Sequence, residues 1–264
     1  MGQQWKNAPL YFTVAQIRFN PILSLPTYLP DIQEHFRKRG YPDFKKTLAM
    51  TFNLPLIQNQ NEESQHPTTQ HVERYTFSNL ENTKNFNLEQ NALSFQTTQY
   101  VHFEQFASDL EKGLEIVHKI VGLSFVERIG IRNLDAVMPR EGETLDDYLI
   151  PAVMGLCQKL SGKTQYSFSE TLTHEENGSV LSRTVIQDGQ IGFPPDIMPA
   201  MALNVEERFR QFSGMHAVID ADAFYSVRIS FDLKEVMRKL DALHKCTSAS
   251  FQATIKEHAR TVWA

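Results

Sequence analysis

Residues 215–231 hold the longest regular pattern in the sequence, an alternation of apolar and polar side chains. Ile219, Ala221 and Ala223 share one parity, whereas Asp220 and Asp222 share the other. Because successive side chains of a strand point to opposite faces, this alternation predicts one long strand, or two strands with a bend. One face would be dry and the other wet, which is typical of an antiparallel sheet that packs on one side only.

Two long amphipathic helices are predicted, each suited to covering one face of such a sheet. Within residues 103–121 the apolar side chains recur at intervals of three and four, which keeps them on one helix face. They are Phe103, Phe106, Leu110, Leu114, Val117 and Val121. The second helix begins at Asp232, which forms a capping-box pattern with Glu235. Its apolar stripe runs to residue 262, with a break expected near residues 247–250.

The remaining patterns predict strands and loops. Strands are expected at residues 11–19, 46–54, 74–77, 86–88, 92–100 and 125–134, and a hairpin turns at Asn177-Gly178. A polar stretch at residues 58–70 predicts a surface loop. We therefore expect an α+β protein with mostly antiparallel sheets, each covered on one face by long amphipathic helices.

The chain is expected to form two domains. Residues 138–142 contain Pro139 and Gly142 and are typical of a linker. This predicts an N-terminal α+β domain at residues 1–138 and a C-terminal α+β domain at residues 143–264. Both halves consist of strands, a hairpin and a long terminal helix. Two sub-domains of similar fold are therefore one interpretation, although no exact internal repeat is found.

Composition places the chain among soluble globular proteins. Its 264 residues are 41% hydrophobic and carry a net charge of -5, which excludes a disordered or collagen-like chain and argues against a protein that coats polyanions. No segment approaches the roughly 18 apolar residues of a membrane span, and no signal peptide is visible. Cys157 and Cys246 are far from CxxC spacing. These features predict a cytoplasmic protein without structural disulfides.

Asp220 and Asp222 are the first candidate site residues. They stand two apart on a predicted strand, so both carboxylates point to one face. Two hard oxygen donors can begin a Mg²⁺ or Mn²⁺ site, although a third ligand is not placed by the sequence. The alternative interpretation is the solvated face of a strand.

Arg128 and Arg132 flank Gly130 on another predicted strand and are the favoured ligand or partner contacts. Two guanidinium groups beside a residue without a side chain could bind a carboxylate or a phosphate. The alternative is pairing with acidic residues of neighbouring strands, and an acidic side chain between the two arginines would argue against an anion site.

The histidines and cysteines give weaker evidence of a functional site. His244 and His258 lie along the last predicted helix, about four turns apart, so one ion cannot bind both on a continuous helix. His216 is the other histidine of this region. We interpret such histidines as interior or interface residues, with His244 kept as a candidate partner contact. Cys157 and Cys246 are interpreted as inert.

Several short motifs, taken in order, resemble those of an uncharacterised, sporadically distributed bacterial family of about this length. They include residues 15–21 (AQIRFNP), 93–100 (LSFQTTQY), 128–133 (RIGIRN) and 146–149 (DDYL), and they end with Trp263. The resemblance spans nearly the whole chain. It brings no established activity. It implies a bacterial cytosolic protein of the accessory genome, where partner-binding, immunity and phage-defence roles are common.

The sequence contains no GxSxG elbow, no P-loop and no GxGxxG motif. We therefore predict a non-enzymatic cytosolic accessory protein that recognises another protein and holds no cofactor and no metal. Nucleic-acid binding is disfavoured, membrane binding is not expected, and a homo-oligomer is left open. The alternatives are a metal-dependent phosphodiesterase or nuclease that uses Asp220 and Asp222, and a sensor of an anionic ligand or nucleotide that uses Arg128 and Arg132.

Overall fold

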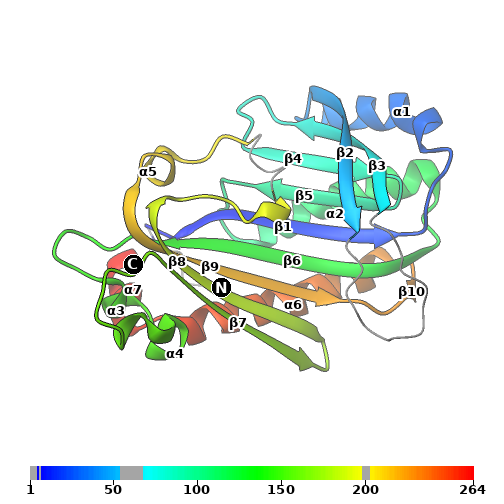
Figure 1. Ribbon diagram of the computed structural model, residues 1–264. Coiled ribbons are helices and arrows are strands. Elements are labelled where there is room, and N and C mark those ends of the chain that lie inside the picture. Colours follow the sequence, from blue (N-terminus) through cyan, green and yellow to red (C-terminus); the bar gives the residue numbers. More distant parts are fainter. Residues whose placement is uncertain (1–4, 6, 54–67, 198–202) are drawn as a thin grey trace.

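The alternating stretch forms β9 (Ser213–Tyr225), an inner strand of one ten-stranded sheet, and the short β10 (Ile229–Ser230) follows it (Figure 1). The structure is a computed structural model that describes residues 5, 7–53, 68–197 and 203–264. The strand order is β2-β3-β4-β5-β1-β6-β9-β8-β7, with β10 paired to β6, and all neighbouring strands are antiparallel. The α+β class predicted from the sequence is confirmed.

The other elements follow in chain order. The strands are β1 (Leu10–Phe19), β2 (Asp43–Asn53), β3 (Thr68–Ser78), β4 (Lys84–Glu89), β5 (Ala92–Thr97), β6 (Phe125–Val137), β7 (Tyr166–Glu175) and β8 (Gly178–Gln190). The helices are α1 (Leu25–Lys38), α2 (Phe103–Val121), α3 (Leu145–Tyr148), α4 (Pro151–Met154), η1 (Gly155–Gln158), α5 (Glu207–Arg210), α6 (Leu233–Thr254) and α7 (Glu257–Trp263). Of the predicted loop at 58–70, residues 58–67 lie outside the described residues, and the rest begin β3.

The main apolar core lies between the sheet and the helices α1, α2 and α6. Ile17 of β1 and Ile131 of β6 belong to the same buried cluster as Phe36, Leu114 and Leu240 of the three helices. Most residues of β1, β6 and β9 in this core are odd-numbered, because alternate side chains of a strand share a face. Val126 is the exception, and it lies where the register of β1 and β6 shifts. Within the described part of the chain, no helix is long and apolar enough to cross a membrane.

The last helix breaks at a different place from the one predicted. It continues through residues 247–250 and ends at Thr254, and α7 begins at Glu257. Ile255 is extended, with φ -102° and ψ 151°, and it bridges to Leu149. The backbone N–H of Lys256 donates to the carbonyl of Tyr148 at 2.7 Å. Backbone pairing with the segment before α4 therefore replaces the helical hydrogen bonds at this point.

The predicted domain boundary falls in the turn after β6, yet the sheet continues across it. β6, before the boundary, pairs antiparallel with β9, beyond it, from Ile129 and Tyr225 to Val137 and Ala217. β1 and β6 also pair antiparallel, from Leu10 and Asp135 to Phe19 and Val126. Each of these strands is followed by one or more helices, an antiparallel meander and a long helix, and each pairs with the last strand of its own meander, β5 or β9. The order of elements matches only when β6 begins the second half, so the repeat would start before β6 and not at residues 138–142. The division into two domains stays a prediction.

Gly113 allows α2 to approach the sheet closely, and we expect Gly113→Ala to destabilise the protein. An added Cβ would overlap the ring of Phe86, which is fully buried. Overpacking costs about 1–3 kcal/mol, which exceeds the gain of about 1 kcal/mol in helix propensity. Urea unfolding would measure the change. Gly162→Ala is the control because its Cβ meets open space, and equal stability of the two variants would contradict this packing.

Candidate functional site

We call the sheet face opposite α1, α2 and α6 the open face. It carries the even-numbered residues of β1 from 12 to 18, of β6 from 128 to 136 and of β9, and Tyr11 joins them beside a register shift of β1. One end of it is covered by the segment before β9. There Phe209 packs on Tyr11, and Phe193 packs on Phe12. Beyond that cover lies a groove of about 260 Å³, lined mainly by polar residues of β1, β3, β4, β5, β6 and β9, together with Asp196. The groove holds most of the sequence-predicted site residues.

Arg132 and Asp220 form a buried ion pair beside this groove. Nε and Nη2 of Arg132 each donate to one carboxylate oxygen of Asp220 at 2.7 Å. Nη1 of Arg132 donates to Asp196 at 2.5 Å, and Nη1 of Arg183 donates to Asp220 at 3.2 Å. Burial alone would lower the pKa of Arg132, but the hydrogen bonds to Asp220 and Asp196 outweigh it and raise that pKa. Arg132 is therefore committed to carboxylates of the protein itself. Asp222 lies opposite Arg132 and 3.8 Å from Arg128, so the acidic side chain that argues against an anion held between these two arginines is present.

Arg128 is far less completely paired. Its Nη2 lies 3.8 Å from the nearest oxygen of Asp222, which is an ion pair without a hydrogen bond. The guanidinium rests over Gly130, where an added Cβ would lie 2.8 Å from Nη1, and it also lies 5.1 Å from the ring of Phe224. Burial lowers the pKa of Arg128, and burial raises the pKa of Asp222. Gly130 thus gives this side chain room to lie on the floor of the groove.

Arg18 lies directly opposite Arg128 in the register of β1 and β6. Its side chain is exposed, and in the described residues it has no ion pair and donates no hydrogen bond. Like charges that face each other on neighbouring strands destabilise a sheet. The two arginines therefore form a cationic pair that the described carboxylates neutralise only in part.

Gln96 adds an unsatisfied donor to the same groove. The residue is 4% exposed, and its side-chain Nε2 is buried without a hydrogen-bond partner among the described residues. Gln96 and Arg132 lie on either side of Val14, and the next residue of β1 on this face, Gln16, also lines the groove. A buried amide without a partner costs about 1–3 kcal/mol, so a ligand oxygen that reached it would relieve that cost.

The surroundings of Asp220 and His244 bear on the metal site and the partner contact predicted from the sequence. Both oxygens of Asp220 already accept hydrogen bonds from arginines. Across the described ranges, no group of three or more His, Cys, Asp or Glu side chains could hold a metal ion. His244 belongs to α6 on the other side of the sheet, where it stacks on Phe103 with 4.0 Å between ring centroids. Burial lowers the pKa of His244. The structure therefore brings Arg128, Arg132, Asp220 and Asp222 together and leaves His244 apart.

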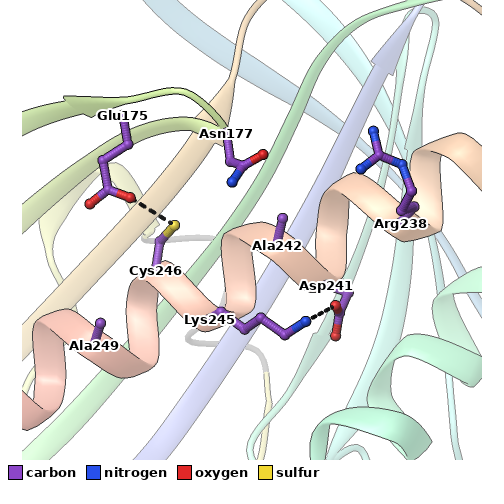
Figure 2. Close-up of a pocket in the computed structure, with 8 residues that line it drawn as sticks. All are labelled: Glu175, Asn177, Arg238, Asp241, Ala242, Lys245, Cys246 and Ala249. Atoms are coloured by element: carbon purple, nitrogen blue, oxygen red, sulfur yellow. Dashed lines mark hydrogen bonds and ion pairs between the residues drawn. The ribbon is translucent and has the colours of Figure 1, made fainter.

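A larger groove of about 460 Å³ lies between the β7–β8 turn and α6 (Figure 2). Its charged side chains pair with one another or with a neighbour: Lys245 contacts Asp241 at 2.6 Å, and Arg238 contacts Glu235 at 2.8 Å. The thiol of Cys246 donates to Glu175 at 3.7 Å (Figure 2). Burial, and then Glu175, raise the pKa of this thiol, which opposes its use as a nucleophile.

Sequence reasoning missed Arg18 and Gln96. The parity of strand 11–19 places Arg18 with Gln16 on the polar face, and this was the available signal. Its pairing with Arg128, and the approach of Gln96 to the same groove, depend on the register of strands far apart in sequence.

Comparison with known proteins adds no relative: no family model, no curated protein and no solved structure matches the chain. The resemblance to a bacterial family stays a prediction. The function must therefore be argued from the geometry of the open face.

Asp220→Ala is expected to destabilise the fold by about 3–5 kcal/mol, because it leaves the buried Arg132 without its bidentate partner. Urea unfolding would measure the loss. Asp241→Ala removes an exposed ion pair and should change stability by less than about 1 kcal/mol. A loss for Asp220→Ala no larger than that of this control would show that the pair is not the buried anchor described.

The buried carboxyl group of Asp135 on β6 predicts that the stability of the protein depends on pH. It is 6% exposed, and burial raises its pKa to about 8. Between its ordinary pKa and this value the folded state binds the proton more tightly than the unfolded state does. Its contribution to stability should therefore fall as the pH rises from about 4 to about 8. In Asp135→Asn that fall should disappear. Thermal unfolding from pH 4 to pH 8 would compare the two proteins, and parallel curves would refute the shift.

Proposed function

We propose that this protein is a binding protein that takes up an anionic group on its open face, with Arg18 and Arg128 as the main contacts. The observation that carries the proposal is the pairing of two arginines across β1 and β6 without a hydrogen bond to a described carboxylate. A carboxylate or phosphate accepts two parallel hydrogen bonds from a guanidinium, which suits this arrangement.

Two further features support an anion in this place. Arg128 is partly desolvated, with 27% of its side chain exposed, so an ion pair to it is stronger than one on the open surface. The amide of Gln96 offers a donor that is free within the described residues, and the amide of Gln16 lines the same groove. Glu89 lies there too, but it already pairs with Arg74 at 2.6 Å. Its charge is therefore largely neutralised.

The other predicted functions have less support. The phosphodiesterase or nuclease alternative stays a prediction. Its metal ion would have to displace Arg132 and Arg183, which both donate hydrogen bonds to Asp220. Recognition of a toxin or defence protein also stays a prediction, because no contact points to such a partner. A protein partner that presents a carboxylate or phosphate would fit the open face as well as a small anion does.

Anion binding should depend on Arg128. Isothermal titration with inorganic phosphate, succinate and ADP would distinguish a phosphate from a carboxylate ligand. For the anion that binds, Arg128→Ala should lower the association constant at least about tenfold, and Arg18→Ala should also lower it. Arg128→Lys should recover part of the loss, because it keeps the charge without the bidentate geometry.

Arg210→Ala is the matched control, since Arg210 is exposed and its nearest acidic partner lies 3.9 Å away. It should bind as the wild type does. Binding that survives in Arg18→Ala and Arg128→Ala would overturn the proposal, and so would wild-type protein that binds none of the three anions.

A further inference from the structure

β7 forms one edge of the sheet and leaves its outer backbone groups unpaired by any described strand (Figure 1). Its inner side pairs with β8 from Tyr166 and Gln187 to Glu175 and Gly178 without a register shift. The strand has ten residues, YSFSETLTHE, with no proline, lysine or arginine. Natural sheets usually protect such an edge with a bulge, a proline, a charge or a covering helix, because an unprotected edge pairs with other strands. β7 carries Glu170 and Glu175, and α4 contacts it where Ser167 donates to the carbonyl of Met154 at 3.4 Å.

The side chains of β7 suit contact with another strand. Tyr166, Phe168 and Leu172 share the open face and are 61%, 46% and 50% exposed. Glu170 shares this face, and the residues of the opposite parity are small and polar: Ser167, Ser169, Thr171 and Thr173. By contrast, the opposite edge strand, β2, carries Lys45 and Lys46, both largely exposed.

The order of elements in the two halves indicates that a strand is missing beside β7. In the first half the sheet runs β1, β5, β4, β3, β2 from the centre outward, and in the second half it runs β6, β9, β8, β7. By position β7 corresponds to β3, and β3 is covered along its length by β2. The second half of the described chain has no strand that corresponds to β2.

We propose that β7 pairs antiparallel with β7 of a second copy of this chain, so that two sheets join edge to edge. With Glu170 at the centre, Phe168 would face Leu172 of the second copy, and Ser169 would face its Thr171; apolar pairs and Ser/Thr pairs both stabilise antiparallel strands. The two Glu170 side chains would meet, but each already pairs with Arg183 of its own chain at 2.8 Å.

Charge complementarity favours a second copy over an unrelated strand. Lys163 stands just before β7; it contacts Asp188 of its own chain at 2.7 Å, but 71% of its side chain is exposed, so it can also face a second acidic group. Glu175 and Glu176 stand at the other end of β7 and are exposed. In an antiparallel pair of identical strands, the basic end of each strand meets the acidic end of the other. This proposal is independent of anion binding, because Arg18 and Arg128 lie on β1 and β6.

Sedimentation velocity of the full chain, from low micromolar to about 1 mM, would test this dimer. The wild type should shift from monomer to dimer over that range. Phe168→Lys combined with Leu172→Lys should raise the dissociation constant at least about tenfold. Leu80→Lys is the control, since Leu80 is 81% exposed in a turn away from β7 and should leave the dimer intact. Circular dichroism and thermal unfolding would confirm that each variant is folded.

Charge reversal makes the test specific for self-pairing. Lys163→Glu alone, and Glu175→Lys with Glu176→Lys, should each weaken the dimer, and all three changes together should restore it. Hydrogen exchange of β7 amides should slow as the wild-type concentration rises. A wild type that stays monomeric to about 1 mM would overturn the proposal and leave a strand of another protein as the occupant. A dimer insensitive to the lysine substitutions, or one that triple reversal fails to restore, would overturn it as well.

Discussion

The pairing of β1 with β6 is the interaction on which the rest of the structure depends. These strands begin the two halves of the chain, and their pairing turns two meanders into one sheet. Its register places Arg18 opposite Arg128 and Val14 opposite Arg132. A slip of one residue would turn the apolar set of a strand toward the solvent, so the buried side chains fix the register strongly. The cationic pair of the open face is thus held in place by the core on the other face.

Local patterns predicted the elements well because local physics determines them. The helix expected at residues 103–121 has those bounds in the structure, and Asp232 caps α6 by accepting from the backbone N–H of Glu235 at 2.8 Å. The α+β class follows from such elements. The break at Ile255 was misplaced, because it depends on hydrogen bonds with residues 148–150, a hundred positions away in the chain. Helix periodicity carries no information about such a partner.

The site was predicted only in part, for the same reason. Parity showed that Arg128 and Arg132 share a strand face, and that Asp220 and Asp222 share another. It could not show that Asp220 would bind Arg132 so completely, while Asp222 stays 3.8 Å from Arg128. That difference depends on the register of β6 and β9, in which Arg132 lies opposite Asp222 but donates its hydrogen bonds to Asp220 on the diagonal. This difference makes Arg132 a structural residue and leaves Arg128 available to a ligand.

The two proposals place their contacts on different parts of the same sheet, and their geometry is compatible. β9 and β8 separate the cationic pair on β1 and β6 from the edge at β7. Two identical strands that pair antiparallel within one sheet are related by a two-fold axis perpendicular to that sheet. Such an axis keeps both open faces on the same side. A dimer built through β7 would therefore present two anion sites on one continuous surface, with neither site covered by the partner. An elongated ligand with repeated negative charges could then reach both sites at once, and its second contact would form at a high effective concentration.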